Sequence, residues 1–569
     1  MENTTNRICR CIAMLLEQHG VKRAIVSPGS RNAPLLIAIS RRNKITTDVV
    51  IDERSAAFIA LGYALISQEP VALICTSGSA LLNYAPAISE AFYRKIPLIV
   101  ISADRPKAWI GQDDSQTIVQ ADALRNYVKR SYDISPDHTD NNVWYANRIA
   151  NDAILTATSG RIGPVHINVQ LDEPLGTLAD DSNDSQDQTL MRTINMIRPT
   201  AKMETREARD LGRTIASPVK VMIVCGFMNP DKTLNKALMR LSELPNIVVV
   251  TETLANLHGK NFITSIDGTL ASMRDEDRME YVPDVVITTG GALVSRHIKQ
   301  LFRSNRIKAH WHVGEIEDTV DCFQQLTTRI EMDPGMFFQQ LASAMQPHRQ
   351  ECDFARKWHI LKDRADSLTM SYAAKSPWSD LKAFATLLPM IPRRWNVQYS
   401  NGTSVRYAQI FSQRENHRCD CNRGVSGIDG CTSTAIGASL AYGDTTLLIT
   451  GDMSCLYDIG ALSCELKTPR VKIIVINNDG GGIFRFIAST SALDVRERMF
   501  CAPSSHSIYE IGQANGFSMH SASDETELRR VFPIFANENQ HPAMLVVNTP
   551  GELSAEILKE YFTYCKSKK

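Results

Sequence analysis

Three oxygen-bearing positions in the last third of the chain have the types and spacing of a divalent-cation site. Asp452 follows one apolar run, Asn478 follows another, and a Gly-rich turn exposes the backbone carbonyl of Gly480. A hard cation such as Mg²⁺ takes carboxylate, amide and carbonyl oxygens when a phosphate completes its shell. Free N–H groups at a helix start after Asp452 would bind the same phosphate. A strand-end Asp or an Asn-Asn turn is common alone, but both in one unit favour the cation site.

A strand–helix–strand unit must position these residues, because 26 positions separate Asp452 from Asn478. Apolar runs at 447–450 and 471–476 predict two strands, and apolar spacing over 454–466 predicts the helix between them. Parallel strands joined by a helix end at the same edge of a sheet. We therefore expect the two polar side chains to meet there.

Length and composition limit the class of protein. A chain of 569 residues is too long to fold around a single hydrophobic core. Its 43% hydrophobic and 22% charged residues are ordinary values for a globular protein. The 62 basic and 62 acidic residues cancel, so nothing suggests nucleic acid as a partner. No apolar run approaches the roughly 18 residues of a membrane span, and the start lacks a signal peptide's apolar segment. Thirteen cysteines without a CxxC pair indicate free thiols in a cytoplasmic protein.

Strand-like runs alternate with helical spacing along the whole chain, which predicts an α/β fold with doubly wound parallel sheets. In the first third these runs end at SPGSR, DER, TSGS and ADRP. The middle third is Rossmann-like in outline but lacks GxGxxG, so we expect no bound dinucleotide. The polar stretch 178–188 predicts a linker. The pattern predicts three domains, at 1–185, 190–345 and 350–569.

The cation pattern resembles the metal–diphosphate signature of thiamine diphosphate enzymes, Gly-Asp-X followed a little under thirty residues later by Asn-Asn. Met453 stands where many members have Gly. The resemblance suggests a role for Glu53, which opens a helix directly after a strand. Thiamine diphosphate needs a carboxylate at N1′ of its aminopyrimidine, so that the 4′-imino group can remove the C2 proton. A first-turn acid that complements the helix dipole is the ordinary alternative.

Six further motifs narrow the resemblance. They stand in the order SPGSR (27–31), DER (52–54), TSGSA (76–80), ADRP (103–106), NRGVSGIDG (422–430) and NNDGG (477–481). Together they resemble the 2-succinyl-5-enolpyruvyl-6-hydroxy-3-cyclohexene-1-carboxylate synthase family, transferases of menaquinone biosynthesis, over nearly the whole chain. The resemblance implies decarboxylation of 2-oxoglutarate and conjugate addition of the resulting succinyl-semialdehyde carbanion to isochorismate. It also implies a pyrimidine-binding, a middle and a diphosphate-binding domain, in that order.

Both implied substrates are dicarboxylates, so one cleft would need several fixed cations, and Arg suits bidentate pairing. The family motifs supply four arginines at strand ends: Arg31, Arg105, Arg406 and Arg423. Arg296 falls where the family usually has a basic pair, and His297 occupies the second position.

The resemblance implies roles for further residues. The catalytic set is Glu53, Ser30 and Gln116, and Gln116 and Asn401 complete the substrate-binding set. The cofactor set is Glu53, Ile428, Asp452, Met453, Ser454, Asn478, Gly480, Gly481 and Ile483. Ile428 would support the bent cofactor, and Mg²⁺ or Mn²⁺ would bind Asp452, Asn478 and Gly480. Gly402 stands where members of the family often have Ser, and Gly482 stands where some have Gln.

Two alternatives remain open. The nearer is another thiamine diphosphate 2-oxoacid decarboxylase or an acetolactate synthase-like carboligase, against which the number of Arg motifs argues. The other is a nucleotide-binding or regulatory protein that kept the fold without chemistry, against which Glu53, Asp452 and Asn478 argue. In the resembled enzymes the carboxylate of one subunit faces the metal ligands of another, so a homodimer, or a tetramer built from dimers, is expected.

Overall fold

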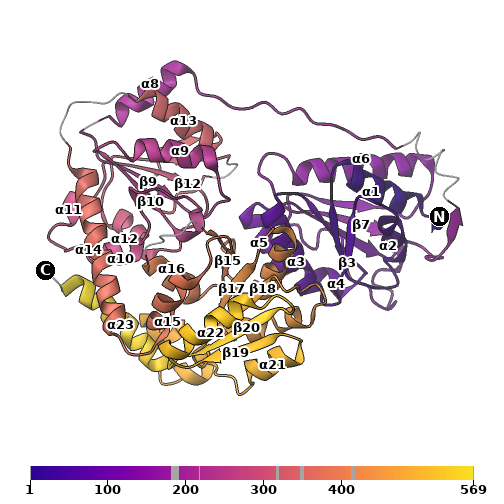
Figure 1. Ribbon diagram of the computed structural model, residues 1–569. Coiled ribbons are helices and arrows are strands. Elements are labelled where there is room, and N and C mark those ends of the chain that lie inside the picture. The colour runs from indigo at the N-terminus through magenta and orange to yellow at the C-terminus, as the bar shows by residue number, and fades with distance from the viewer. Residues whose placement is uncertain are drawn as a thin grey trace. The chain divides into compact units, whose positions relative to one another are not determined.

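The computed structural model describes residues 2–180, 191–216, 218–315, 319–345, 352–411 and 417–567. Its strands form three six-stranded sheets, and helices alternate with the strands along the chain (Figure 1). The strand pairs with a defined register in these sheets are parallel. The predicted α/β fold with parallel sheets is confirmed.

The first sheet carries the N-terminal motifs at its strand ends. Its strands in spatial order are β3 (Thr46–Val49), β2 (Arg23–Val26), β4 (Val71–Cys75), β5 (Leu98–Asp104), β7 (Val165–Gln170) and β6 (Ser131–Ile134). The helices of this region are α1 (Arg7–Gln18), α2 (Ala33–Ser40), α3 (Glu53–Ser67), α4 (Ser79–Asn83), α5 (Ala85–Arg94) and α6 (Asp140–Ala157). Apolar residues of α1, α2 and α6 share one core with alternate strand residues.

The strand expected to end at DER (52–54) ends earlier in the structure, and it occupies Thr46–Val49. The chain turns after this strand because Asp52 is the N-cap of α3. The Asp52 side chain accepts a hydrogen bond from the Arg54 N–H at 3.1 Å. Ile51 therefore leads into the helix and is 81% exposed.

The second sheet lies in the middle third. Its order is β11 (Phe262–Ile263), β10 (Ile247–Thr251), β9 (Val221–Cys225), β12 (Val285–Thr289), β13 (Ala309–Val313) and β14 (Thr328–Ile330). The helices are α8 (Thr205–Thr214), α9 (Lys232–Leu241), α10 (Ile266–Ala271), α11 (Arg278–Tyr281), α12 (Arg296–Ser304), α13 (Pro334–Ala344) and α14 (Phe354–Lys375). Successive residues of β9 enter two separate cores, because successive side chains point to opposite faces and both faces are covered.

The third sheet carries the predicted cation site. Its order is β16 (Arg418–Cys421), β15 (Asn396–Tyr399), β17 (Thr446–Gly451), β18 (Val471–Asn477), β20 (Ala543–Asn548) and β19 (Ser518–Ala522). The helices are α15 (Asp380–Leu387), α16 (Ser404–Ile410), α17 (Cys431–Ala441), α18 (Asp452–Tyr457), α19 (Ile483–Phe486), α20 (Ala488–Ser491), α21 (Ile508–Ala514), α22 (Glu525–Asn537) and α23 (Gly551–Ser567). β17 and β18 are central, so their polar ends lie away from the sheet's edge strands.

The chain packs as two compact units. The first comprises 1–198, 422–446 and 457–471, and the second comprises 199–421, 447–456 and 472–569. Each sheet falls within one of the three predicted domain ranges. The limits at 1–185, 190–345 and 350–569 themselves stay a prediction.

Helices α3 and α17 pack face to face within the first unit. Glycines make this approach possible: a Cβ on Gly62 would lie 2.0 Å from the Thr434 carbonyl oxygen, and one on Gly437 would lie 2.0 Å from that of Ile59. The packing joins the segment after the NRGVSGIDG motif to the N-terminal sheet.

Two local predictions are wrong. The helix predicted at 454–466 ends at Tyr457, and a 3-10 helix follows at Ile459–Ser463. Tertiary contacts interrupt it: buried Asp458 accepts hydrogen bonds from the Ser433 N–H at 2.7 Å and hydroxyl at 2.9 Å. The linker predicted at 178–188 begins with a strand, β8 (Leu178–Asp180), which pairs antiparallel with β1 (Glu2–Thr4); its remaining residues lie outside the described ranges.

All thirteen cysteines are free and most are buried, as predicted. Within the described ranges, none of the helices combines the length and apolar character that crossing a bilayer requires.

The close packing of α3 and α17 is testable with Gly437→Ala. The added methyl group would overlap the Ile59 carbonyl oxygen, and overpacking of this kind costs about 1–3 kcal/mol. We expect the thermal midpoint of the protein to fall by several degrees. Gly443→Ala is the matched control, since nothing lies within 4 Å of its added Cβ. Equal midpoints for the two variants would contradict the packing described.

Candidate functional site

The predicted cation ligands lie at the ends of β17 and β18. Asp452 begins α18 directly after β17, and its Oδ2 accepts a hydrogen bond from the Gly480 N–H at 2.7 Å. Its Oδ1 accepts one from the Met453 N–H, also at 2.7 Å. Asn478 directly follows β18 and is 4% exposed. The 26-residue spacing thus brings Asp452 against the Gly-rich turn, as the strand–helix–strand pattern predicts.

Glycine is required at position 480. Its φ of +109° is rarely adopted by other residues, and a Cβ there would lie 2.1 Å from the Cys501 carbonyl oxygen. The next residue is tied to the same carbonyl, which accepts a hydrogen bond from the Gly481 N–H at 2.8 Å. The turn is therefore held close to the π-helix at Glu497–Cys501.

The charge of Asp452 is buried with little compensation. Burial raises the pKa of its carboxyl to about 6, against the lowering effect of the Gly480 and Met453 N–H groups, and the carboxylates of Asp380 and Asp479 raise it further. A divalent cation would stabilise the ionised carboxylate here. The described ranges contain no group of three or more His, Cys, Asp or Glu side chains that could bind a metal. A cation at Asp452 would therefore need amide and carbonyl oxygens, which Asn478 and Gly480 provide, and this donor set fits Mg²⁺.

Arg485 holds the backbone of the same turn and was not predicted. Its guanidinium donates to the carbonyl oxygens of Asn478 at 2.7 Å and Asp479 at 2.8 Å. It also pairs with Glu497 at 2.7 Å, and this hydrogen bond lowers the pKa of that carboxyl to about 2. The only sequence signal was an Arg between the aromatic residues of a short apolar segment.

Glu53 occupies the first turn of α3 in the first unit. It is half-buried, and its Oε2 accepts a hydrogen bond from the Asn83 amide at 3.3 Å. Large apolar side chains nearby in the sequence are exposed to solvent: Val49 is 59% and Ile51 81% exposed.

The NRGVSGIDG segment is anchored to α5 in the first unit. Buried Glu90 accepts hydrogen bonds from the N–H groups of Gly424 and Val425, both at 2.7 Å. Burial raises the pKa of Glu90, while Arg94 and these N–H groups lower it. Glu90 was also not predicted, and a lone acid in the apolar stretch AISEAF was its only signal. Arg423 and Ile428 on this segment are half-buried.

The two substrate-site arginines predicted near the N-terminal sheet are both ion-paired. Arg31, 6% exposed, donates to the Leu171 carbonyl at 3.1 Å and lies 3.2 Å from the Glu173 carboxylate. Arg105 lies 2.9 Å from Asp114 and donates to the Ser115 carbonyl at 3.0 Å.

Gln116 and Ser30 complete the predicted set in the first unit. The Gln116 amide donates to the Ser77 carbonyl at 3.1 Å, and Ser30 is exposed. Both belong to the loops that follow strands of the first sheet, at β5 and β2.

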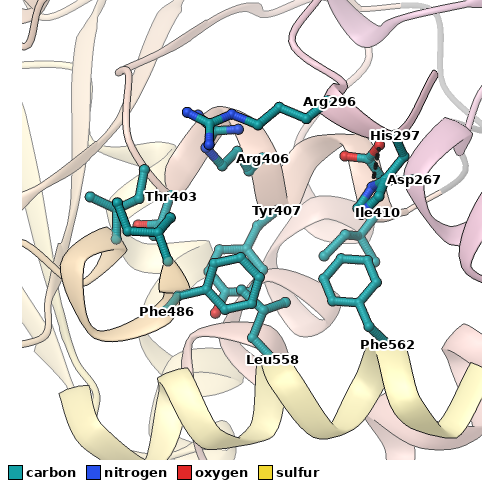
Figure 2. A pocket seen from close by; sticks show the side chains of 12 residues that line it. Asp267, Arg296, His297, Thr403, Arg406, Tyr407, Ile410, Phe486, Leu558 and Phe562 are labelled. Atoms are coloured by element: carbon teal, nitrogen blue, oxygen red, sulfur yellow. Dashed lines mark hydrogen bonds and ion pairs between the residues drawn. The ribbon is translucent and has the colours of Figure 1, made fainter. Parts of the chain in front are cut away.

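A cavity of about 130 Å³ in the second unit is lined by three of the predicted site residues: Arg296, Arg406 and Ile483. Figure 2 shows the guanidinium groups of Arg296 and Arg406 on one side of it and Phe486, Leu558 and Phe562 on the other. The remaining lining residues are Asp267, His297, Thr403, Tyr407, Ile410 and Ile487. A cavity with cationic and apolar sides suits a carboxylate attached to a carbon skeleton. Asn401 is absent from this lining; its side-chain oxygen accepts a hydrogen bond from the Cys421 thiol at 3.4 Å.

His297 adds a second ionisable group beside Arg296. Its Nδ1 lies 3.2 Å from the Asp267 carboxylate (Figure 2). That hydrogen bond raises the pKa of His297, against the lowering effects of burial and of Arg406. The ring therefore holds its proton more tightly than a free imidazole does, and the second basic position of this chain carries a titratable group.

Comparison with known proteins identifies the family. Residues 7–124 match the family described as thiamine pyrophosphate enzyme, N-terminal TPP binding domain. The chain is 38% identical to a 2-succinyl-5-enolpyruvyl-6-hydroxy-3-cyclohexene-1-carboxylate synthase of Porphyromonas gingivalis, covering 97% of this chain and 96% of that protein. Proteins of the same name from Flavobacterium psychrophilum and Bacteroides fragilis are 36% and 34% identical, each covering 98% of both chains.

The chain belongs to this synthase family. The predicted resemblance is thereby confirmed over nearly the full length. Similarity to the synthases spans both compact units, so it includes the loops of the first sheet as well as the predicted cation site. The individual roles of the site residues remain predictions.

The raised pKa of His297 predicts a pH-dependent charge. Its folded-state value lies above 6.5, so the stabilising contact with Asp267 is fully present below pH 6.5 and lost as pH rises through the raised value. We expect an NMR titration midpoint above 6.5 for His297, assigned with His297→Gln, and a lower midpoint in Asp267→Asn. His310, whose pKa burial lowers to about 4, is the internal control and should stay neutral from pH 6 to 8. An unchanged His297 midpoint in Asp267→Asn would show that the carboxylate does not hold the proton.

Proposed function

We propose that this chain is a thiamine diphosphate-dependent transferase that decarboxylates 2-oxoglutarate and adds the resulting succinyl-semialdehyde carbanion to isochorismate in menaquinone biosynthesis. The product is 2-succinyl-5-enolpyruvyl-6-hydroxy-3-cyclohexene-1-carboxylate. The observation that carries the proposal is full-length similarity to curated synthases of that name. The buried, oxygen-rich site at Asp452 supports it.

Binding of the cofactor is assigned to two parts of the chain. Asp452, Asn478 and the Gly480 carbonyl would hold Mg²⁺ or Mn²⁺, and the N–H groups that begin α18 at Met453 and Ser454 would approach the diphosphate. Gly481 and Ile483 would border it, and Ile428 would support the bent cofactor from the NRGVSGIDG segment. When bound, thiamine diphosphate supplies an acidic C2–H group and a thiazolium ring that accepts the electron pair released by decarboxylation.

Proton movement is assigned to Glu53. Its carboxylate would hold a proton at N1′ of the aminopyrimidine, which makes the 4′-imino group basic enough to deprotonate C2. Gln116 and Ser30 would lie beside the reacting substrate. Asn401 would contribute an amide to the same substrate set.

Recognition of the two dicarboxylates is assigned to the arginines. Arg31, Arg105 and Arg423 would contribute from the first unit, and Arg296 and Arg406 from the cavity in the second. Fixed guanidinium groups orient each carboxylate and stabilise charge that develops during the reaction. A generic 2-oxoacid decarboxylase or acetolactate synthase-like carboligase handles less acidic substrates and has less use for five such positions.

Assembly as a homodimer, or as a tetramer of two dimers, is part of the proposal. Exposed apolar side chains stand next in sequence to Glu53 (Val49 and Ile51) and to its hydrogen-bond partner Asn83 (Leu82), and they suit a surface covered by a second subunit. We propose a cytoplasmic location, in keeping with the many buried free thiols.

The direct test is incubation of the purified protein with 2-oxoglutarate, isochorismate, thiamine diphosphate and Mg²⁺, followed by mass analysis of the product. A mass that retains both carboxylates of isochorismate and gains a succinyl unit supports the proposal. Release of CO₂ with no carbon–carbon bond formed would favour the decarboxylase alternative.

Glu53→Gln isolates the proton-transfer role. Glutamine keeps the size of the side chain and one hydrogen bond to the cofactor but cannot take the N1′ proton. We expect exchange of the C2 hydrogen of bound thiamine diphosphate, followed by NMR after acid quench, to slow by at least about 100-fold. Affinity for the cofactor should change little. Exchange at the wild-type rate would remove Glu53 from this role.

Arg31→Ala tests carboxylate recognition. Loss of the guanidinium leaves a substrate carboxylate unpaired in a partly buried site, so kcat/KM should fall at least about tenfold, which corresponds to about 1.4 kcal/mol. Lys at position 31 should restore only part of it, because the planar fork is lost. Arg130→Ala is the matched control, since Arg130 also pairs with one acid, Asp152 at 2.8 Å, but at an exposed position. An Arg31→Ala variant that loses cofactor affinity and keeps its substrate constants would assign Arg31 to the diphosphate instead.

A further inference from the structure

A buried carboxylate, Asp380, lies directly behind the predicted cation ligand Asn478. Asp380 begins α15 and is 2% exposed. Its Oδ2 accepts a hydrogen bond from the Asn478 amide nitrogen at 2.8 Å. Its Oδ1 accepts hydrogen bonds from the hydroxyl groups of Thr549 at 2.6 Å and Ser554 at 3.3 Å. The Ser554 hydroxyl in turn accepts the Asp380 N–H at 3.0 Å, so the carboxylate is fixed on three sides.

This contact distinguishes the two ends of the Asn478 amide. An amide side chain has one accepting oxygen and one donating nitrogen, whereas an ionised carboxylate only accepts. With its nitrogen directed at Asp380, Asn478 has its oxygen left for a cation. The reverse orientation would place oxygen against oxygen at Asp380 and present N–H groups to the cation, which repels them.

The backbone of Asn478 is fixed independently. Arg485, 4% exposed, donates to its carbonyl oxygen at 2.7 Å. Side chain and main chain are thus held by different partners, and the side-chain orientation depends on Asp380.

We propose that Asp380 is a positioning residue of the cation site, which selects the orientation of the Asn478 amide that binds the metal. This rests on the proposed function, because it assigns Asn478 to the cation. No part of the Gly-Asp-X…Asn-Asn signature includes Asp380, and it precedes that signature by a long stretch of chain. Partners that orient metal ligands in this way are commonly worth 10–100-fold in metal affinity.

Exchange of the two residue types gives a sharp test. In Asp380→Asn, the oxygen of the new amide keeps the Thr549 and Ser554 hydroxyl groups, so its nitrogen faces the nitrogen of Asn478, and one amide must turn. In Asn478→Asp, two buried carboxylates meet, so they either repel each other or share a proton, and both outcomes disturb the ligand at position 478. Each single variant should therefore bind the cation at least about tenfold more weakly, although aspartate is ordinarily a better cation ligand than asparagine.

The double variant Asp380→Asn/Asn478→Asp should recover affinity. The amide nitrogen at position 380 then donates to one carboxylate oxygen at position 478, and the other oxygen remains for the cation. The number of carboxylates in the pair is unchanged. If Asp380 only stabilised the fold, the second substitution would not restore cation affinity.

The measurement is Mn²⁺ binding to the full-length protein at saturating thiamine diphosphate, with free Mn²⁺ followed by electron paramagnetic resonance. Mg²⁺ titrations by calorimetry provide a second probe. Asp420→Asn is the matched control: Asp420 is also 2% exposed in the third sheet, and it accepts hydrogen bonds from Arg418 at 3.0 Å and Asn396 at 3.1 Å, which are not predicted cation ligands. This variant should lose thermal stability and keep its Mn²⁺ affinity within about threefold.

The outcomes separate the proposals. Weak single variants with a recovered double variant support the role of Asp380. An Asp380→Asn affinity within about threefold of wild type, or a double variant no better than either single one, overturns it. If the wild type binds Mn²⁺ and cofactor but forms no product from 2-oxoglutarate and isochorismate, the proposed function fails while the Asp380 comparison still holds. A wild type that binds no cofactor overturns both.

Discussion

The predicted site depends on one unfavourable placement, a carboxylate buried where two parallel strands end. Asp452 has only backbone N–H groups as hydrogen-bond donors in the described structure, and Asp380 and Asp479 add negative potential around it. A protein tolerates such a group when ligand binding compensates for its desolvation. The surrounding features follow from that need: a glycine turn that brings a carbonyl close, an arginine that fixes the turn, and an amide held in one orientation. Each reduces the rearrangement that cation binding would otherwise require.

The fold was largely predictable from the sequence, because central strands such as β4, β9 and β10 are continuous apolar runs, as buried parallel strands commonly are. β4 and β10 coincide with the runs VALIC and IVVVT of the sequence. The errors occur where contacts between residues far apart in the sequence determine the secondary structure. The helix after Asp452 is broken by Asp458, whose partner Ser433 lies on another helix, and β8 exists only because β1 pairs with it. Local periodicity contains no information on either partner.

The site was predictable only where its residues belong to motifs. The contact of Asp452 with Gly480 follows from strand order, which the spacing encodes. Glu90, Asp380 and Arg485 were missed because each belongs to none of the motifs, and nothing in the sequence around it identifies its partner. Their shared property is three-dimensional: each is buried and satisfies the backbone or side chain of a motif residue. Motifs identify the residues expected to contact ligands. The residues that hold those motifs in place are scattered along the chain.

The ion pair between Arg31 and Glu173 means that an acidic substrate would compete with a carboxylate of the protein itself. Arg31 is nearly buried, whereas the Glu173 side chain is 65% exposed. A substrate carboxylate that pairs with Arg31 would displace an internal counterion, and Glu173 would pass into water with little loss of hydration. Binding would then be a form of anion exchange, in which Glu173 neutralises the guanidinium whenever no substrate is bound. Affinity then reflects the difference between two carboxylates rather than the full strength of one salt bridge. A site of this kind would reject small monovalent anions that cannot displace Glu173, and it would favour ligands with a second point of attachment.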